Sequence, residues 1–415
     1  MALEHIRQLT CVACGRHYGT DTLYTCPACG LEGILDVEYD LDRAARTLTR
    51  QALAERPHSH WRYQELLPVD FGRPLPHLQV GMTPVYPTPR LAEAVGVKAL
   101  WVKDDGRNPT ASFKDRASSV GVVKARELGK EAIACASTGN AASSLAGFSA
   151  AVGLKSFIFV PERAPEPKIA QLLIFGATVL RVHGTYDQAW QFCQEACAKY
   201  GWYNRNCAVN PYLVEGKKTV GLELGETLGD EVPDWVVLSV GDGCTFAGAW
   251  KGLQQMHQLG FLKKLPKMLG VQAAGSAPIT EAWKSGANEI KTVDAQTLAD
   301  SIAVGTPRNW RKALRAVRES NGAMVNVEDA DILDAMRKTA RLAAVFGEPA
   351  GAASVAGVMA AVKQGVVGAG ETALCVITGN GLKDVKSAIH ATTPPIDLAP
   401  EMDALEAELK ERRLI

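Results

Sequence analysis

The sequence has no excess of charge of either sign and no long apolar run. Its 415 residues carry 45 lysines and arginines against 45 aspartates and glutamates, a formal net charge of +0. A neutral chain has no overall field that would attract nucleic acid or an anionic membrane. No apolar stretch reaches the roughly 20 residues that cross a bilayer, and residues 1–10 lack the apolar core of a signal peptide. We therefore expect a cytoplasmic protein whose partners are small molecules, not nucleic acid or membranes.

Short apolar runs alternate with segments of helical periodicity along most of the chain. The runs expected to form strands are 100–102, 132–136, 156–160, 178–182, 235–240, 268–272 and 373–378. This alternation predicts an α/β fold with parallel sheets that helices cover on both faces. Because the chain is too long for a single core, we expect two α/β lobes with a ligand between them, at the carboxyl ends of strands. The charged segment 404–413 is predicted to be a solvated helix.

Four of the ten cysteines form two Cys-x-x-Cys pairs near the start of the chain, and a glycine directly follows each pair. The pairs are Cys11–Cys14 and Cys26–Cys29. Four thiolates at this spacing can bind zinc tetrahedrally, and in a reducing compartment they favour a metal over disulfides. A closed four-thiolate site has no open position for a substrate, so the predicted zinc is structural. Such ribbons sometimes bind nucleic acid, but this one is not basic.

One lysine stands at the start of a predicted helix. Residues 108–116 read Asn-Pro-Thr-Ala-Ser-Phe-Lys-Asp-Arg, a turn that leads into a helix and places Lys114 just inside its first turn. The positive field at a helix N-terminus favours the neutral amine, which can condense with an aldehyde. Most lysines in such positions are simply solvated, so this segment alone supports either interpretation.

Two loops between a predicted strand and a predicted helix have the composition of anion-binding turns. The loop Ser-Thr-Gly-Asn at 137–140 follows the strand 132–136, and its backbone N–H groups could bind a carboxylate. The loop Gly-Asp-Gly-Cys-Thr at 241–245 follows the strand 235–240, and its glycines let N–H groups close on a phosphate. A glycine-rich turn is also an ordinary tight connection.

In their order along the chain, these segments resemble the motifs of the threonine synthase family, which are fold type II enzymes that use pyridoxal 5'-phosphate. The family's lysine motif is Asn-Pro-Thr-Gly-Ser-Phe-Lys-Asp-Arg, and Ala111 replaces its glycine here. Further similar segments are 61–63, 210–211, 215–219, 305–310 and 379–384. The resemblance implies a homodimer with a zinc ribbon at 1–38, a large cofactor-binding domain formed by 39–105 and 206–415, and a small α/β domain at 106–205.

The resemblance also implies a role for each matched position. Lys114 would bind the cofactor and take the proton from the substrate Cα. The substrate carboxylate would lie against Ser137, Thr138, Gly139 and Asn140, and Asn140 would also contact the cofactor ring hydroxyl. The cofactor phosphate would lie against Gly241, Asp242, Gly243, Cys244 and Thr245. The hydroxyl of Thr378 would donate to the ring nitrogen, a neutral pairing that suits elimination and replacement.

The positions that would hold a phosphorylated substrate have changed. Threonine synthases act on O-phosphohomoserine, whose phosphate is a second dianion that needs several donors. The resemblance puts those donors at Ala141, Ala208, Leu213 and Asp242, which are apolar or acidic. Each lost charge-assisted hydrogen bond costs about 1.5–3 kcal/mol. We therefore expect a lyase that performs β- or γ-elimination, or replacement, on an unphosphorylated amino acid, although Arg205 and its neighbouring asparagines could supply substitute donors.

Two alternatives remain open. One is threonine synthase itself, which converts O-phospho-L-homoserine and water into L-threonine and phosphate. The other is a catalytically silent regulatory or binding homologue, but a silent protein would have no reason to keep Lys114, Asn140 and Thr378. The roles of three further charged residues stay open, because surface or helix-end charge explains them equally well; they are Lys168, Arg308 and Glu348.

Overall fold

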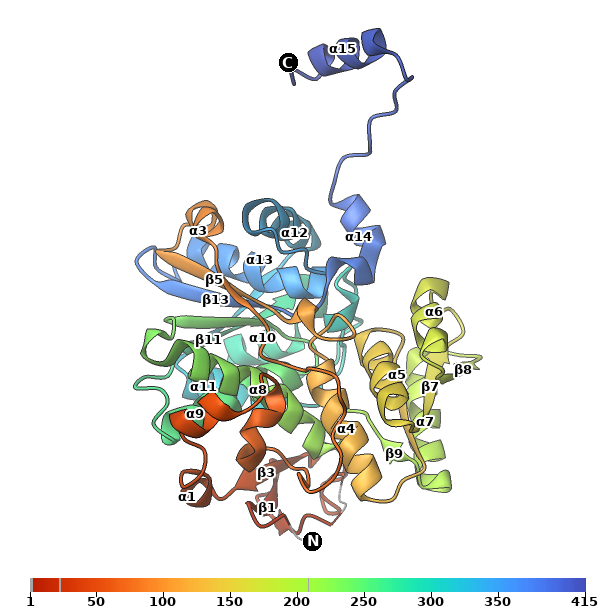
Figure 1. The fold of residues 1–415 in the computed structure, drawn as a ribbon, viewed down its shortest axis with the longest axis vertical. Coiled ribbons are helices and arrows are strands. Elements are labelled where there is room, and N and C mark those ends of the chain that lie inside the picture. Colours follow the sequence, from red (N-terminus) through yellow and green to blue (C-terminus); the bar gives the residue numbers. More distant parts are fainter. Residues whose placement is uncertain (1–2, 22–23, 208) are drawn as a thin grey trace.

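The computed structural model describes residues 3–21, 24–207 and 209–415, which form three sheets and their covering helices (Figure 1). The smallest sheet lies beside the N-terminus and is antiparallel, with the order β2-β1-β3. Its strands are β1 (Ile6–Cys11), β2 (His17–Tyr18) and β3 (Leu35–Tyr39). Two short helices and a 3-10 segment connect it to the body of the protein: α1 (Leu41–Ala44), α2 (Arg50–Glu55) and η2 (His60–Leu66).

The largest sheet has the order β12-β11-β10-β13-β5-β4, and only the edge strand β4 is antiparallel to its neighbour. Its strands are β4 (Val85–Pro87), β5 (Ala99–Asp104), β10 (Trp235–Ser239), β11 (Lys267–Ala273), β12 (Ala323–Val327) and β13 (Thr372–Ile377). The two innermost strands, β10 and β13, are mostly apolar and almost entirely buried, as expected when both faces of a parallel sheet are covered.

Two groups of helices cover this sheet and form a separate apolar core on each face. The first group is α8 (Pro211–Leu228), α9 (Cys244–Gln258), α10 (Pro278–Ser285) and α11 (Trp310–Glu319). The second group is α3 (Pro89–Val95), α12 (Asp329–Ala343) and α13 (Pro349–Lys363).

The third sheet is wholly parallel, has the order β8-β7-β6-β9, and lies at the right of Figure 1. Its strands are β6 (Ala132–Ala136), β7 (Lys155–Pro161), β8 (Thr178–Val182) and β9 (Tyr203–Asn204). Its helices are α4 (Asp115–Glu127), α5 (Asn140–Val152), α6 (Glu166–Ile174) and α7 (Tyr186–Tyr200). The predicted α/β class and all seven predicted strands are confirmed, whereas β4, β9 and β12 were not predicted.

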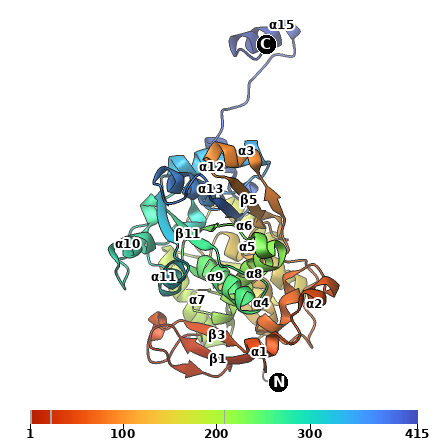
Figure 2. The same cartoon turned by 90° about the vertical axis from the view of Figure 1, so that its left-hand side faces the viewer.

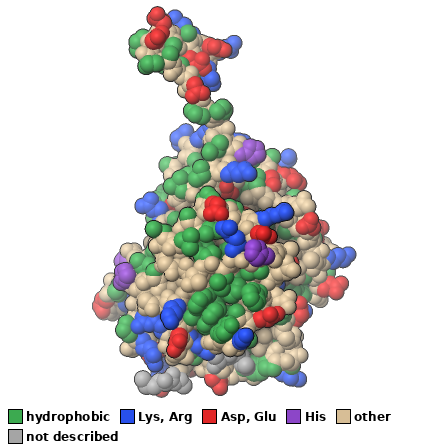
Figure 3. Space-filling view, turned by 90° about the vertical axis from the view of Figure 1, so that its right-hand side faces the viewer, with side chains coloured by type: hydrophobic (Ala, Val, Ile, Leu, Met, Phe, Trp, Pro, Cys, Tyr) green, Lys and Arg blue, Asp and Glu red, His purple; other side chains and the backbone are tan. Residues whose placement is uncertain are grey.

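The chain ends in two helices, α14 (Val385–His390) and α15 (Met402–Glu411), joined by an extended segment. The helix α15 has no buried residue and extends away from the body (Figure 2), as the charge pattern of 404–413 predicted. Basic and acidic side chains are interspersed on the face that Figure 3 shows, in keeping with the balanced composition. Within the described ranges, no helix is long and apolar enough to cross a bilayer.

The cysteine-bearing sheet is attached to the large sheet's helices through one acid on β3. Asp36 is 2.9 Å from the Lys251 amine of α9, 3.1 Å from the Lys312 amine and 3.0 Å from the Arg315 guanidinium of α11. Although burial opposes ionisation, these cations hold the pKa of Asp36 well below its usual value. Lys251 also lies 2.7 Å from Glu215 of α8. The small sheet therefore braces the helices that line the site described next.

Candidate active site

A cleft of about 750 Å³ lies between the two parallel sheets, and residues far apart in the sequence line it together. They include Lys114, the loops 137–141 and 241–246, and Thr378. The loops follow β6 and β10, so the cleft is at the carboxyl ends of strands, where open α/β sheets bind their ligands. The sequence predicted this convergence of the lysine, both anion-binding loops and the threonine.

Backbone hydrogen bonds hold the lysine loop against the end of β13. The Phe113 N–H donates to the Thr378 carbonyl at 2.8 Å, and the Asn380 N–H donates to the Ala111 carbonyl at 3.1 Å. These bonds bring Lys114 and Thr378 to the same part of the cleft. Ala111 itself has a φ of 62°, a left-handed conformation that glycine adopts at lower cost than alanine.

Lys114 has an unusually low pKa for a lysine. Burial is the largest cause, and the positive charge of Lys217 adds to it, so that the pKa falls from 10.5 to about 8. At pH 7 about a tenth of the amine is then neutral, against roughly one part in 3,000 at the ordinary value. The helix α4 begins at Asp115, so Lys114 is the residue just before the first turn and not inside it as predicted. Its environment, more than its helix position, prepares the amine for nucleophilic chemistry.

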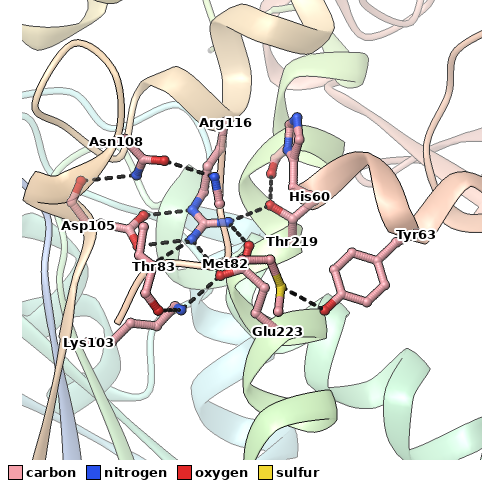
Figure 4. Close-up of polar contacts among 12 residues, drawn as sticks. His60, Tyr63, Met82, Thr83, Lys103, Asp105, Asn108, Arg116, Thr219 and Glu223 are labelled. Atoms are coloured by element: carbon pink, nitrogen blue, oxygen red, sulfur yellow. Dashed lines mark hydrogen bonds and ion pairs between the residues drawn. The ribbon is translucent and has the colours of Figure 1, made fainter. Parts of the chain in front are cut away.

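A buried network of ion pairs fixes the start of α4 (Figure 4). The Arg116 guanidinium donates to Asp105 at 2.6 Å and to Glu223 of α8 at 2.8 Å. The Lys103 amine of β5 lies 2.8 Å from the same glutamate. All four side chains are almost completely inaccessible, and their two positive charges balance two negative ones. The network connects β5, α4 and α8, and it was not predicted from the sequence.

The loop 137–140 leads into α5, whose first residue is Asn140. The Asn140 amide donates to both carboxylate oxygens of Glu348, at 2.8 and 2.9 Å. Glu348 precedes α13 and is 5% exposed. Burial raises the pKa of Glu348, while Asn140 and the charge of Lys114 oppose that rise. The glutamate, whose role the sequence left open, thus holds the asparagine beside the cleft.

The glycine loop presents the N-terminus of α9 to the cleft, because α9 begins at Cys244 and Gly243 has a φ of 91°. The Asp242 carboxylate is held in place, because it accepts a hydrogen bond from the backbone N–H of Arg308 at 2.7 Å. The Cys244 sulfur accepts from the Asn309 amide at 2.8 Å. A helix N-terminus with surrounding N–H groups is suited to a phosphate.

The four positions that were expected to face the substrate side chain are not equivalent. Ala141 and Asp242 line the cleft. Leu213 is 0% exposed, packs near Gly121 of α4, and is not among the described residues that line the cleft. Ala208 lies outside the described residues. Lys217, the first lysine of the Lys-Lys pair in α8, also lines the cleft and was not predicted from the sequence.

Two further cations form contacts with residues that line the cleft, Asp300 and Trp190. The Arg308 guanidinium stacks over the Trp190 ring of α7, 4.3 Å from its centroid. The Lys168 amine of α6 forms an ion pair with Asp300. Both contacts join a helix of the small parallel sheet to the segment between α10 and α11, so Lys168 and Arg308 link the two sides of the cleft.

The four predicted metal ligands lie together at the N-terminal sheet, with all four sulfur atoms within 4.8 Å of one another. The two Cys-x-x-Cys turns have the same backbone geometry. In each, a glycine with a positive φ donates to the first cysteine's carbonyl at 2.9 Å: Gly15 to Cys11, and Gly30 to Cys26. This donor set fits a tetrahedral zinc ion.

Comparison with known proteins places residues 77–379 in the family described as "Pyridoxal-phosphate dependent enzyme". The chain is 42% identical over 400 residues to a threonine synthase of Methanosarcina acetivorans, covering 96% of this chain and 97% of that one. It is 38% identical over 404 residues to a threonine synthase of Methanocaldococcus jannaschii, covering 97% and 99%.

Solved structures with the same fold include threonine deaminase isoform 2 from Solanum lycopersicum, with a TM-score of 0.65, 23% identity and coverage of 75% of this chain and 87% of that one. Maize serine racemase has a TM-score of 0.63, 20% identity and coverage of 80% and 93%. At this level of identity, the structures support the fold alone.

Proposed function

Because this chain belongs to the threonine synthase family of pyridoxal-phosphate-dependent enzymes, we propose that it converts O-phospho-L-homoserine and water into L-threonine and phosphate. The observation that carries the proposal is similarity to threonine synthases over 96% of the chain and not over the cofactor-binding region alone. The expectation of an unphosphorylated substrate has no support in these comparisons, which favour the alternative that the sequence left open.

The residues of the cleft fit the cofactor of the family. Bound pyridoxal phosphate supplies an electron sink next to the substrate Cα. Lys114, with its pKa of about 8, is the amine that would attach the cofactor and carry the Cα proton. The N–H groups of 241–245 at the start of α9 would bind the cofactor phosphate. The Thr378 hydroxyl would donate to the ring nitrogen.

The opposite wall would position the substrate. The N–H groups and hydroxyls of Ser137, Thr138 and Gly139 would bind its carboxylate, and Asn140 would contact the cofactor ring hydroxyl. Glu348 holds the Asn140 amide in place through two hydrogen bonds. With the carboxylate on one wall and the cofactor on the other, the Cα–H bond would face Lys114.

The test is an assay of the holoenzyme with O-phospho-L-homoserine and, in parallel, with L-homoserine. Threonine synthase activity releases phosphate and L-threonine in equal amounts from the first substrate only, and Lys114→Ala abolishes both products. Turnover of the unphosphorylated amino acid, with none of the phosphorylated one, would refute the proposal.

We also propose that Cys11, Cys14, Cys26 and Cys29 bind one structural zinc ion. Metal analysis of the purified protein should give one zinc per chain, and Cys14→Ser should lower that value sharply. A full-length protein that keeps its thermal stability without any metal would contradict this assignment. The homodimer and the cytoplasmic location remain predictions, and the domain limits at 38, 105 and 205 are proposed as the sequence placed them.

A further inference from the structure

Two buried cations in the cleft form no ion pair with a carboxylate among the residues that the structure describes. Arg205 is 2% exposed and Lys217 is 4% exposed, and both line the cleft. In the part of the chain that the structure describes, no carboxylate oxygen lies within 4.0 Å of either one. The buried Lys218 beside them does have such a partner, Glu215 at 2.6 Å. Burying an unpaired cation is costly, so the arrangement indicates that an anion binds there.

Arg205 is held in a fixed orientation on the wall formed by the small parallel sheet. Its backbone N–H donates to the Ala134 carbonyl of β6 at 2.8 Å. Its guanidinium donates to the Ser118 hydroxyl of α4 at 2.9 Å and to the Cys207 sulfur at 3.5 Å. The Ser118 hydroxyl orients the guanidinium without neutralising it. Burial opposes ionisation of the Cys207 thiol, but Lys217 and Arg205 lower its pKa. A guanidinium held in this way can present two parallel N–H groups to a phosphate.

Lys217 reaches the cleft from α8. It lies on α8, and its Cβ is 3.3 Å from the position that a Cβ on Gly248 of α9 would occupy. Burial disfavours its charge, but Cys207, Cys244 and Asp242 raise its pKa, so the amine stays protonated. Its positive charge also lowers the pKa of Lys114, for which burial is the larger cause. Lys217 is therefore close to both the catalytic lysine and Arg205.

The cofactor does not account for both of these cations. Its phosphate has the N–H groups of the glycine loop and the dipole of α9, a fifteen-residue helix. A phosphorylated amino acid brings a second dianion into the same cleft, and two cations match its charge. The positions where the sequence analysis sought donors do not supply them, since Ala141 is apolar and Leu213 is buried in the α4–α8 contact.

We propose that Arg205 and Lys217 bind the phosphate of the substrate as a pair of cations, one from the segment after β9 and one from α8. This inference rests on the proposed function, because it assigns the substrate's phosphate and not the cofactor's. It makes the two residues determinants of specificity for phosphorylated amino acids over their unphosphorylated counterparts.

The experiment uses the variants Lys217→Gln and Arg205→Gln. Lys263→Gln is the control, because its exposed amine pairs with Asp230 and neither residue is among those that line the cleft. The KM for O-phospho-L-homoserine and the inhibition constant of inorganic phosphate are measured on the holoenzyme. The dissociation constant of pyridoxal phosphate is measured on the apoprotein from its absorbance. We expect both phosphate-dependent constants to rise about ten- to a hundredfold in the two cleft variants, with cofactor affinity and the control unchanged.

The affinity for pyridoxal phosphate shows whether the two cations bind the phosphate of the cofactor or that of the substrate. A loss of pyridoxal phosphate binding with an unchanged inhibition constant for inorganic phosphate would overturn the proposal, since the cations would then serve the cofactor. Arg205→Lys keeps the charge but cannot form a bidentate hydrogen bond with phosphate. If this variant raises the inhibition constant of phosphate to an intermediate value and leaves the melting temperature unchanged, the effect is on anion binding and not on folding.

The proposed function can fail without this inference failing. If the wild-type holoenzyme makes no threonine, the binding of inorganic phosphate still tests whether Arg205 and Lys217 form an anion site. If phosphate shifts the cofactor absorbance of the wild type, but not of the two cleft variants, Arg205 and Lys217 bind the phosphate as proposed. Equal phosphate affinity in all variants would overturn this inference.

Discussion

Replacing Glu223 with glutamine should destabilise the protein strongly, because this residue balances two buried cations. The substitution keeps the shape of the side chain but removes its charge, which leaves Arg116 and Lys103 with only Asp105 as a buried anion. Removing one partner from a buried ion pair costs about 3–5 kcal/mol, mostly from the uncompensated charge. We therefore expect the free energy of unfolding in urea to fall by about 3–5 kcal/mol.

A second substitution makes this reasoning testable. Lys103→Met removes the excess cation, so the double variant should be less destabilised than the sum of the two single variants, with a coupling of about 1–3 kcal/mol. The matched control is Glu231→Gln, an exposed glutamate in the 3-10 turn after α8, which should change stability by less than about 0.5 kcal/mol. Additive single effects, or a Glu223→Gln variant as stable as the control, would refute the charge-balance account.

Glu223 should also make the stability of the protein depend on pH. Burial opposes ionisation of Glu223, but Arg116 and Lys103 hold its pKa below the ordinary 4.5. A depressed carboxylate pKa contributes stability that is complete above the ordinary value and is lost as the pH falls below it. The loss of stability below pH 4.5 should be smaller in Glu223→Gln than in the wild type, and an identical acid-side slope would contradict this.

Three other perturbations follow from the site. The rate at which the apoprotein takes up pyridoxal phosphate should rise with pH and level off above about 8, because only neutral Lys114 attacks the aldehyde; a rise that continues to pH 10 would indicate an ordinary lysine. Ala111→Gly should stabilise the protein by about 0.5–1 kcal/mol in urea unfolding, because glycine relieves the positive φ at the expense of a more flexible unfolded chain; a lower urea midpoint would show that no strain is present. Removing zinc with a chelator should lower the melting temperature and the activity together, because Asp36 of the ribbon braces α9 and α11; full activity in a metal-free protein would contradict that coupling.

The parts of the site that could be predicted are the loops, because their turn residues and their order along the chain determine their conformation and position. Residues 108–116, 137–140 and 241–245 each contain the turn chemistry of a loop between a strand and a helix. Parallel strands bring such loops to one edge. Most of the predicted strands are short, largely apolar runs, and all seven are present in the structure.

The features that were missed depend on side-chain direction and on partners distant in sequence. Arg116, two residues after Lys114, pairs with a glutamate on α8 that a single sequence does not identify. Lys217 and Lys218 are adjacent, yet one lines the cleft and the other is buried against Glu215. Leu213 was expected beside the substrate but packs against α4. The strand β9 has only two residues, too few to give a periodic pattern.

The most direct test of the account is the reaction of O-phospho-L-homoserine with the holoenzyme in water labelled with oxygen-18. If the chain is a threonine synthase, the carbon–oxygen bond to the phosphate breaks and water adds at Cβ. The label then appears in the hydroxyl of L-threonine and not in the released phosphate. Labelled phosphate with L-homoserine as the other product, or no turnover of this substrate, would contradict the central claim.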